Sequence, residues 1–315
     1  MWVYVIKRVL AFIPTVFIVL TLIFVLTRII PGDPAWVLVG HQGVTQEKVE
    51  EVRQQLGIDK PILIQYITWL PKVFKGDFGN SIFYQRPVIE LISERFTVTL
   101  SLASIALLLT LIIALPLGIL SATNHNTLVD NVSMVSAVLG VSLPQFWLGF
   151  LFIILFSVTL RWFPTSGYRR LSFGFIPWIR YLFLPVLALS LSQIALLTRI
   201  TRSSMLEVLG KEYIVTAQAK GLSQGKVVYK HALKNAMITI ITAVGLVFAL
   251  SLGGSVIIEN VFAIPGLGRL IVTAAIRRDY PIIEGGMLYL TGIALLINLL
   301  VDISYTFINP QVMYE

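Results

Sequence analysis

Long runs of apolar residues, broken by short polar segments, are the dominant pattern of this chain. A helix that crosses a membrane needs about 20 consecutive, mostly apolar residues. Six stretches meet that requirement, and they cover residues 9–30, 97–123, 132–160, 181–198, 235–258 and 285–301. Since such runs are too long and too poor in charge for the core helices of a soluble protein, the pattern predicts an all-α integral membrane protein with six transmembrane helices.

The composition agrees with this prediction. Of the 315 residues, 57% are hydrophobic and 13% are charged, whereas a soluble protein averages about 25% charged residues. The chain has no cysteine, which excludes disulfides, thiol nucleophiles and cysteine metal sites. Its formal charge of +8 suggests an orientation in the membrane and contact with anionic lipid before it suggests nucleic acid.

The N-terminal run begins like a secretory signal peptide. It is longer than the hydrophobic region of such a peptide, however, and no cleavage site of small residues follows it. We therefore expect residues 1–31 to form an uncleaved transmembrane helix. The other runs predict an inserted segment over 32–96, a five-helix core over 97–308 and a cytoplasmic tail over 309–315.

The inserted segment is too long for a plain turn. It opens with the turn signal PGDP and continues with TQEKVEEVRQQLG, in which Thr45 is a candidate N-cap and Gly57 a stop signal. The next stretch, ILIQYITWLPKVF, has an apolar and aromatic face that could lie among lipid headgroups or pack on the transmembrane helices. The segment is therefore expected to form a small helical subdomain on the extracytoplasmic side.

Basic residues indicate the orientation of the helices. Lys7 and Arg8 precede the first run and favour a cytoplasmic N-terminus. Six crossings return the C-terminus to the cytoplasm, and they place the loop 199–235 there as well. That loop contains seven Lys and Arg residues against two Glu, as the positive-inside rule predicts. The turn at 124–131 should also be cytoplasmic, yet it has neither Lys nor Arg.

Within the loop 199–235 the sequence predicts a helix, a sharp turn and a second helix. Residues from about 206 to 220 are mostly good helix formers, and Gly221 suits a left-handed C-cap. Ser223 can cap a second helix that continues into the fifth apolar run. The small residues Ala217 and Ala219 would let another backbone approach closely, which favours a docking site for a partner. The alternative is a basic loop that only obeys the charge rule or binds anionic lipid.

Motifs for catalysis are incomplete. Residues 221–227 come near a phosphate-binding loop, but they are one residue short and lack the hydroxyl that holds magnesium. Ser223 and Lys226 fit S-x-x-K without the companion elements of that hydrolase pattern. His125 and Asp130 could pair a base with an orienting carboxylate in a membrane-bound transferase, or they could simply lie in a cytoplasmic turn. Three histidines without an H-E-x-x-H motif argue against a metal site.

Ionisable residues are rare within the apolar runs. Arg28, Glu259 and Asp302 lie near the ends of runs, where they can mark the membrane edge or serve a function. The runs lack the chain of carboxylates that a proton-driven carrier would use, which argues against a secondary transporter. A stand-alone secondary transporter or channel nevertheless stays open as an alternative.

A family resemblance extends along the whole chain. The loop contains YIVTAQAKGLSQGKVVYKHALKNAM, which resembles the cytoplasmic loop of ABC-importer permeases of the dipeptide, oligopeptide and nickel type. Further motifs of that family occur in the expected order: KRVLAFIPTVFIVLTLIFVLTRIIPGDPA, QLGIDKPILIQYITWL, GDFGNSI, SLPQFWLG, VIIENVFAIPGLGRL, RRDYPIIEG and LVDISYTFINPQV. The broader ABC-importer signature, E-A-A-x3-G-x9-I-x-L-P, is matched only by Ala217, Gly221 and Leu233. Its Glu is missing, so any ion pair which that residue makes in the broader family is not expected here.

The resemblance implies a type I ABC importer (MetI-like) fold with a helical extracytoplasmic insertion between the first and second transmembrane helices. The chain would form half of a pore, and a homologous second permease subunit would form the other half. It would contact membrane lipid, and nucleic acid is not an expected partner. Two cytosolic ATPase subunits would bind ATP and Mg²⁺, so the chain would need no cofactor, metal or catalytic residue. An extracytoplasmic substrate-binding protein would deliver di- or oligopeptides, with nickel chelates, haem and sugars as alternatives.

The resemblance also implies a location and a docking site. The location is the cytoplasmic (inner) membrane of a bacterium or archaeon, with both termini in the cytoplasm. The residues that match the family's loop would dock the ATPase, and they are Thr216, Ala217, Ala219, Lys220, Gly221, Leu222 and Leu233. The force of ATP-driven closure on this loop would alternate the access of the pore, whose lining residues the sequence does not identify.

Overall fold

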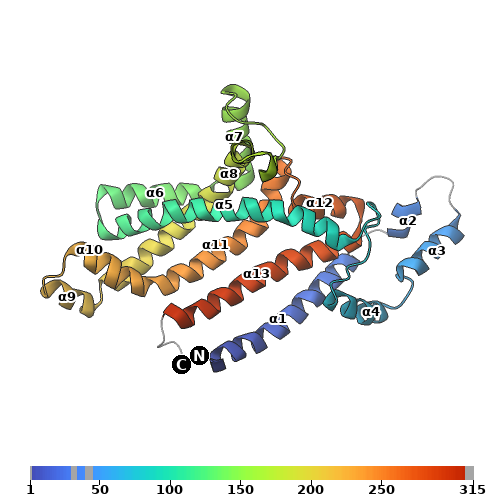
Figure 1. Cartoon of the computed structure of the whole chain (residues 1–315), viewed down its shortest axis with the longest axis horizontal. Helices are drawn as coiled ribbons and strands as arrows, with labels where there is room; N and C mark the ends of the chain where they lie inside the picture. The colour runs from blue at the N-terminus through green and yellow to red at the C-terminus, as the bar shows by residue number, and fades with distance from the viewer. Residues whose placement is uncertain (1, 30–33, 40–44, 309–315) are drawn as a thin grey trace. The chain divides into compact units, whose positions relative to one another are not determined.

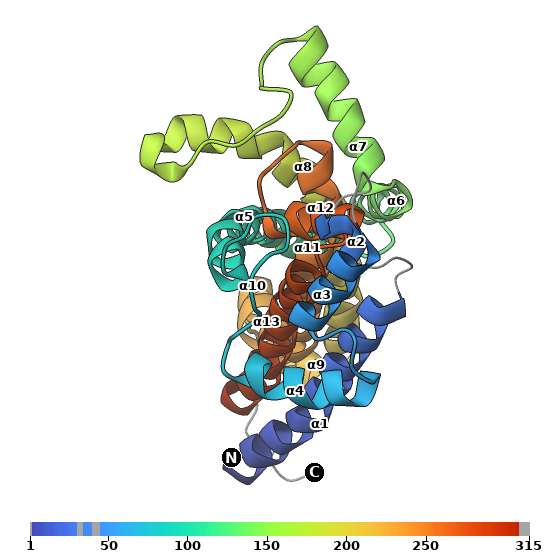
Figure 2. The ribbon, with the colours of Figure 1, turned by 90° about the vertical axis from the view of Figure 1, so that its right-hand side faces the viewer.

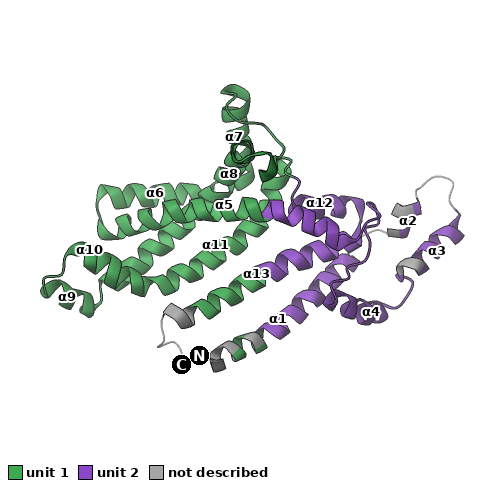
Figure 3. Ribbon diagram, in the orientation of Figure 1, with its two compact units in different colours: residues 1–11, 100–264, 294–315 green, residues 12–99, 265–293 purple. Residues whose placement is uncertain are grey.

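The computed structural model describes residues 2–29, 34–39 and 45–308, and the regular elements of these residues are all helices (Figure 1). Residues 31–33 of the expected PGDP turn and the expected tail at 309–315 lie outside the described residues. The chain divides into two compact units, which are described separately (Figure 3). Unit 1 comprises residues 1–11, 100–264 and 294–315, and unit 2 comprises residues 12–99 and 265–293.

Long apolar helices occur where the apolar runs predict them. Among the described residues, five helices are long and apolar enough to span a membrane, and a sixth span would be a bent pair of helices. The five are α1 (Trp2–Ile29), α5 (Val88–Thr123), α8 (Phe175–Leu209), α11 (Leu233–Val261) with the turns before it, and α13 (Tyr280–Ile308). The predicted all-α membrane fold is therefore confirmed.

The third predicted span is not one straight helix. α6 (Leu128–Ser142) and α7 (Gln145–Phe152), which continues in the π-helical η1 (Ile153–Thr159), are bent by 96°. Leu143 and Pro144 between them are extended, because a residue before proline avoids the helical region and proline has no N–H to donate. Figure 2 shows α7 turning away from α6 before the chain returns to α8.

α5 begins at Val88, although its apolar run predicts a start at residue 97. The added turns are amphipathic: Val88 and Ile92 are buried, while Glu90 is exposed and pairs with Arg86 at 3.2 Å. A continuous apolar run does not extend into such turns, because charged side chains interrupt it on one face.

α8 is also longer than its apolar run, which covers only residues 181–198. The helix continues through Pro185, and its C-terminal part buries Thr198, Thr201 and Ser204. Hydropathy underestimates the length of this helix because polar residues lie on a face that the protein itself covers.

The described part of the inserted segment, in unit 2, is helical as predicted. It contains α2 (Pro34–Val39), α3 (Gln46–Leu56) and α4 (Ile62–Phe74). Thr45 occupies the N-cap position of α3, though its side chain makes no capping hydrogen bond. Gly57 ends α3 in the left-handed conformation, with a φ of +67°.

A buried carboxylate holds the turn between α4 and α5 in unit 2. Asp279 accepts hydrogen bonds from the hydroxyl of Ser81 at 2.6 Å and from the backbone N–H groups of Ile82 and Phe83. Asp279 lies between α12 (Leu267–Arg277) and α13, so it joins segments 198 residues apart. The core of this unit comprises Val88, Leu91, Ile92, Leu267, Leu270, Ala274, Ile282 and Ile283.

Helices α5 and α8 approach each other closely in unit 1. A Cβ atom added to Gly118 would lie 2.6 Å from Cβ of Thr201 and 2.9 Å from the carbonyl oxygen of Thr198. Gly253 in α11, by contrast, has no heavy atom within 4 Å of an added Cβ. Helix packing therefore requires glycine at the first position and not at the second.

We predict that Gly118→Ala lowers the apparent melting temperature of the purified protein, whereas Gly253→Ala leaves it unchanged or raises it. Both substitutions gain about 1 kcal/mol of helix propensity. The methyl group at position 118 also overpacks the contact with α8, which costs about 1–3 kcal/mol. Thermal denaturation in detergent measures the difference. Equal melting temperatures for the two variants would contradict the close packing of α5 on α8.

Candidate functional site

A helical hairpin follows α8 in unit 1. We call it the basic hairpin and define it as residues 211–232. It contains α9 (Glu212–Ala219), α10 (Gln224–Lys226) and the π-helical η3 (Val227–Ala232). η3 leads directly into α11, so the second half of the basic hairpin is continuous with a membrane-spanning helix, as predicted.

The first half of the hairpin differs from the prediction. A single helix over residues 206–220 is wrong, since α8 ends at Leu209 and α9 begins at Glu212. Lys211 between them is extended, with φ −76° and ψ 145°. Gly210, which precedes it, has a low helix propensity, and the break at this point separates α9 from α8.

The turn of the basic hairpin, which we call the elbow and define as residues 220–223, follows the prediction. Gly221 has a φ of +77°, in the left-handed region that glycine adopts without a steric penalty. Its N–H group donates to the carbonyl oxygen of Gln218 at 2.9 Å. Ser223 occupies the N-cap position of α10, and its carbonyl oxygen accepts from Val227 N–H at 3.1 Å.

One face of the basic hairpin is buried against neighbouring helix ends. Ile214 of α9 is fully buried, and Val227 and Val228 of η3 are nearly so. They belong to an apolar cluster, here called the root cluster, whose buried members are Ile119, Ala122, Met205, Val208, Ile214, Val227, Val228, Ala232, Ala236 and Ile240. Burial of one such aliphatic side chain contributes about 1.5–3 kcal/mol. The root cluster therefore fixes the hairpin to the ends of α5, α8 and α11.

The seven residues predicted to dock an ATPase fall into two groups. Those of the first group, Thr216, Ala219, Lys220 and Gly221, are exposed. Those of the second group are covered: Ala217 is 9% exposed, and Leu222 and Leu233 pack against the root cluster. The first group is available for direct contact with a partner, whereas the second group helps to hold the hairpin in place.

Further exposed side chains of the basic hairpin, Val215 and Tyr229 among them, are absent from the predicted set. Val215 is 59% exposed and Tyr229 is 64% exposed. In α9 the buried positions are Ile214 and Ala217, so Val215 lies on the opposite face of the helix. The sequence could have indicated Val215 as a contact residue, because the helical period places it on a different side of α9 from the buried Ile214 and Ala217.

Positive charge surrounds the elbow. Lys220, Lys226, Lys230 and Lys234 are exposed, whereas Lys211 lies 3.4 Å from the carboxylate of Glu207. Such a group of lysines attracts an acidic protein surface or anionic lipid. Charge alone therefore leaves both interpretations of the loop open.

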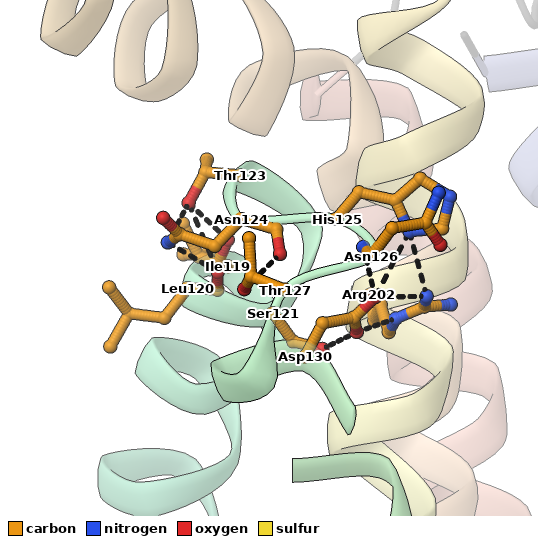
Figure 4. Close-up of polar contacts among 10 residues, drawn as sticks. All are labelled: Ile119, Leu120, Ser121, Thr123, Asn124, His125, Asn126, Thr127, Asp130 and Arg202. Atoms are coloured by element: carbon orange, nitrogen blue, oxygen red, sulfur yellow. Dashed lines mark hydrogen bonds and ion pairs between the residues drawn. The ribbon is translucent and has the colours of Figure 1, made fainter. Parts of the chain in front are cut away.

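Asp130 is the centre of a polar network at the turn between α5 and α6 (Figure 4). Its two oxygens accept hydrogen bonds from Nε and Nη2 of Arg202 in α8, at 2.6 and 2.7 Å. The hydroxyl of Ser121 donates to it at 2.6 Å, and the backbone N–H of Asn126 donates at 3.0 Å. Nδ1 of His125 lies 3.0 Å from the same carboxylate.

This geometry argues against a catalytic role for Asp130 and His125. Asp130 is 2% exposed, and both of its oxygens are already bound by Arg202 and by neighbouring donors. A bidentate guanidinium–carboxylate pair is strong and directional, so the network joins α5, α6 and α8. Arg202 lies less than one helical turn before Met205 of the root cluster, which connects the network to the hairpin.

Arg28 and Asp302, two of the ionisable residues expected near the membrane edges, form ion pairs within their own units. In unit 1, Arg8 of α1 pairs with Asp302 of α13 at 3.2 Å, which brings the start of α1 next to the end of α13. In unit 2, Arg28 of α1 pairs with Glu284 of α13. Glu259 of α11 is fully buried. Among the described residues, no three His, Asp or Glu side chains could together hold a metal ion.

Two family models match this chain. Residues 114–314 match the model of the binding-protein-dependent transport system inner membrane component. Residues 1–103 match the model of the N-terminal part of such membrane components.

Relatives match over almost the whole length. A putative peptide transport system permease protein of Brucella abortus (strain 2308) is 44% identical over 311 residues, which cover 99% of each chain. A probable peptide ABC transporter permease protein of Sinorhizobium fredii (strain NBRC 101917 / NGR234) is 40% identical over 314 residues, which cover 100% of each chain. The glutathione transport system permease protein GsiC of Escherichia coli (strain K12) is 43% identical over 312 residues, which cover 99% of each chain.

A solved structure shares the fold. It is the MetNI methionine ABC transporter in an inward-facing conformation, with a TM-score of 0.59 and 18% sequence identity. The match covers 70% of this chain and 96% of the other chain. At this level of identity the likeness concerns the fold alone, and it confirms the predicted type I ABC importer fold.

We predict that Asp130→Asn destabilises the protein by about 3 kcal/mol, because an amide cannot pair with Arg202 and its NH₂ group meets other donors. His125→Asn is expected to have a much smaller effect, since that side chain is 48% exposed. Thermal and denaturant-induced unfolding of the purified variants, followed by tryptophan fluorescence, measures both effects. A loss for Asp130→Asn no larger than that for His125→Asn would refute the structural role of the network.

Proposed function

Because this chain belongs to the family of binding-protein-dependent transport system inner membrane components, we propose that it imports peptides and that its basic hairpin receives the force for import. The chain is a membrane-spanning permease subunit of an ABC importer. One observation carries the proposal for the hairpin. The same short segment exposes an elbow and buries its other face in the root cluster, among the ends of α5, α8 and α11.

The elbow is suited to insertion into a groove of a partner. An added Cβ at Gly221 would have no heavy atom within 4 Å, so the space around this residue is open. Thr216 and Ala219 beside it are small and exposed. Val215 and Tyr229 offer apolar area on the same hairpin, and the surrounding lysines favour an acidic groove.

The proposed partner at the elbow is a cytosolic ATPase subunit. Two such subunits would bind ATP and Mg²⁺, and a homologous second permease subunit would complete the pore. The relative named as a peptide ABC transporter permease supports this assembly. The description of the family as binding-protein-dependent supports an extracytoplasmic substrate-binding protein as a further partner.

Force would pass from the elbow to the transmembrane helices through the root cluster. Closure of the ATPase subunits on ATP would displace α9 and η3, and the buried side chains would carry this movement to α5, α8 and α11. The network of Ser121, Asp130 and Arg202 would keep α5, α6 and α8 moving together. Access to the pore would then alternate between two states whose balance the nucleotide shifts.

The proposed substrates are di- or oligopeptides. Two of the compared relatives are named for peptide transport and a third for glutathione transport. These names support peptides over the nickel chelates, haem and sugars that the family resemblance leaves open. The choice among peptides would rest mainly with the binding protein.

The basic hairpin and both termini would lie on the cytoplasmic side of the membrane. The exposed lysines near the elbow support this orientation. The pair between Arg8 and Asp302 supports it as well, because it places the start of α1 and the end of α13 at the same end of their unit.

We predict that Gly221→Asp reduces ATP-driven peptide uptake by the reconstituted importer about tenfold or more, the loss expected for a central contact of an interface. An acidic side chain at this position obstructs the insertion of the elbow into an acidic groove. Uptake of a labelled peptide into proteoliposomes measures transport, and co-purification of the ATPase subunits measures docking.

Gly57→Asp is the matched control for this experiment. Gly57 and Gly221 have φ values of +67° and +77°, and neither has a heavy atom within 4 Å of an added Cβ. Both variants therefore carry the same backbone strain, and only Gly221→Asp should lose uptake. Equal loss in both variants, full uptake by Gly221→Asp, or uptake by the permease without any ATPase subunit would each refute the proposal.

A further inference from the structure

Helix α4 lies against α1 in unit 2 (Figure 3). The ring of Phe24 in α1 contacts the rings of Tyr66 and Trp69 in α4, with centroids 5.1 and 5.2 Å apart. Farther along both helices, the rings of Phe17 and Phe74 lie 5.7 Å apart. All of the α1 residues in these contacts belong to its apolar span. α4 therefore lies beside the part of α1 that crosses the membrane.

α4 also carries exposed apolar side chains. Ile62, Leu63 and Ile67 are exposed by 62%, 69% and 59%. On α1, Leu26 and Ile29 are likewise exposed, by 51% and 68%. A large exposed apolar surface on a helix that packs on a membrane span is covered by lipid acyl chains rather than by water.

A pocket of about 380 Å³ lies beside this apolar face and is lined by residues of α1, α4, the turn after α4 and the start of α13. Ile62 belongs both to the exposed face and to the pocket lining. The aromatic rings of Trp69 and Tyr280 also line it. Arg28, another lining residue, lies in the last turn of the apolar span of α1. That position, together with the Trp and Tyr side chains, places the pocket at the level of the lipid headgroups.

Charged side chains of both signs line the pocket: Arg28, Lys72, Asp77 and Glu284. Arg28 and Glu284 form an ion pair, and Gln65 accepts a hydrogen bond from Nε of Arg28 at 3.3 Å. Lys72 and Asp77 are exposed. The pocket therefore offers cations to an anionic group and carboxylates to an ammonium group of the same ligand.

We propose that this pocket binds the headgroup of a zwitterionic phospholipid with a primary amine, of the phosphatidylethanolamine type. The phosphate contacts Lys72 and Arg28, the ammonium group contacts Asp77 and Glu284, and the acyl chains cover the exposed faces of α4 and α1. A short zwitterionic peptide would match the charges, but it has no hydrocarbon chains to cover the apolar face that begins at Ile62. The inference rests on the membrane location of the chain and not on the solute that it transports.

The test uses the purified full chain after removal of lipid in detergent. Three phospholipids with identical acyl chains and different headgroups are titrated separately. Phosphatidylethanolamine is expected to raise the apparent melting temperature and to stay bound in native mass spectrometry. Phosphatidylcholine, whose quaternary amine donates no hydrogen bond, and phosphatidylglycerol, which has no amine, are expected to bind about tenfold more weakly, the effect of one charged hydrogen bond.

A double variant assigns the effect to the pocket. Lys72→Gln with Asp77→Asn is expected to abolish the preference for phosphatidylethanolamine, while Lys75→Gln, at an exposed lysine outside the lining, retains it. Unchanged melting temperatures of the lipid-free variants show that they fold. Equal binding of the three lipids, a preference that survives in the double variant, or displacement of the lipid by a dipeptide at similar concentration would each overturn the proposal.

Discussion

Burial of Ile214, Val227 and Val228 among the ends of α5, α8 and α11 is the interaction on which the proposed function of this permease depends. A basic loop that did not pack in the root cluster could bind a partner or a lipid, but it could not move the membrane helices. Displacing the basic hairpin would expose several aliphatic side chains, at a cost of about 1.5–3 kcal/mol each. In the proposed mechanism the hairpin and the helix ends would therefore move as one body, and the elbow at Gly221 would be the exposed part of that body.

Charged residues add to the stabilisation that the root cluster provides, because they join segments that are distant in sequence. Asp130 and Arg202 join α6 to α8 in unit 1, and Asp279 holds the turn at residues 81–83 in unit 2. Charges near a membrane are costly unless they are paired. Each of these contacts therefore specifies which segments stay together, and in the proposed mechanism the network at Asp130 would extend the moving body from the hairpin to α6.

Much of the fold could be predicted from the sequence, because long apolar runs indicate membrane spans and glycines indicate helix ends. The stops at Gly57 and Gly221 depend on one residue each and were correct. The break before α9 and the bend at Pro144 were missed, since hydropathy does not show where an apolar or mixed run changes direction. The contact between Asp130 and Arg202 joins residues 72 positions apart, and no local pattern contains that information. For the same reason the burial of Ala217 was not foreseen, although its neighbours Ala219 and Gly221 are exposed as expected.

The absence of cysteine from the chain allows a direct test of the elbow as the contact with the ATPase. In membranes that contain the whole importer, Ala219→Cys receives a crosslinker with one thiol-reactive and one photoreactive end. We predict a covalent adduct with an ATPase subunit and no modification by a membrane-impermeant thiol reagent added from outside. Glu47→Cys, at an exposed position of α3, should give the opposite result in both assays. Labelling of Ala219→Cys from outside, or no adduct with an ATPase subunit, would contradict the account.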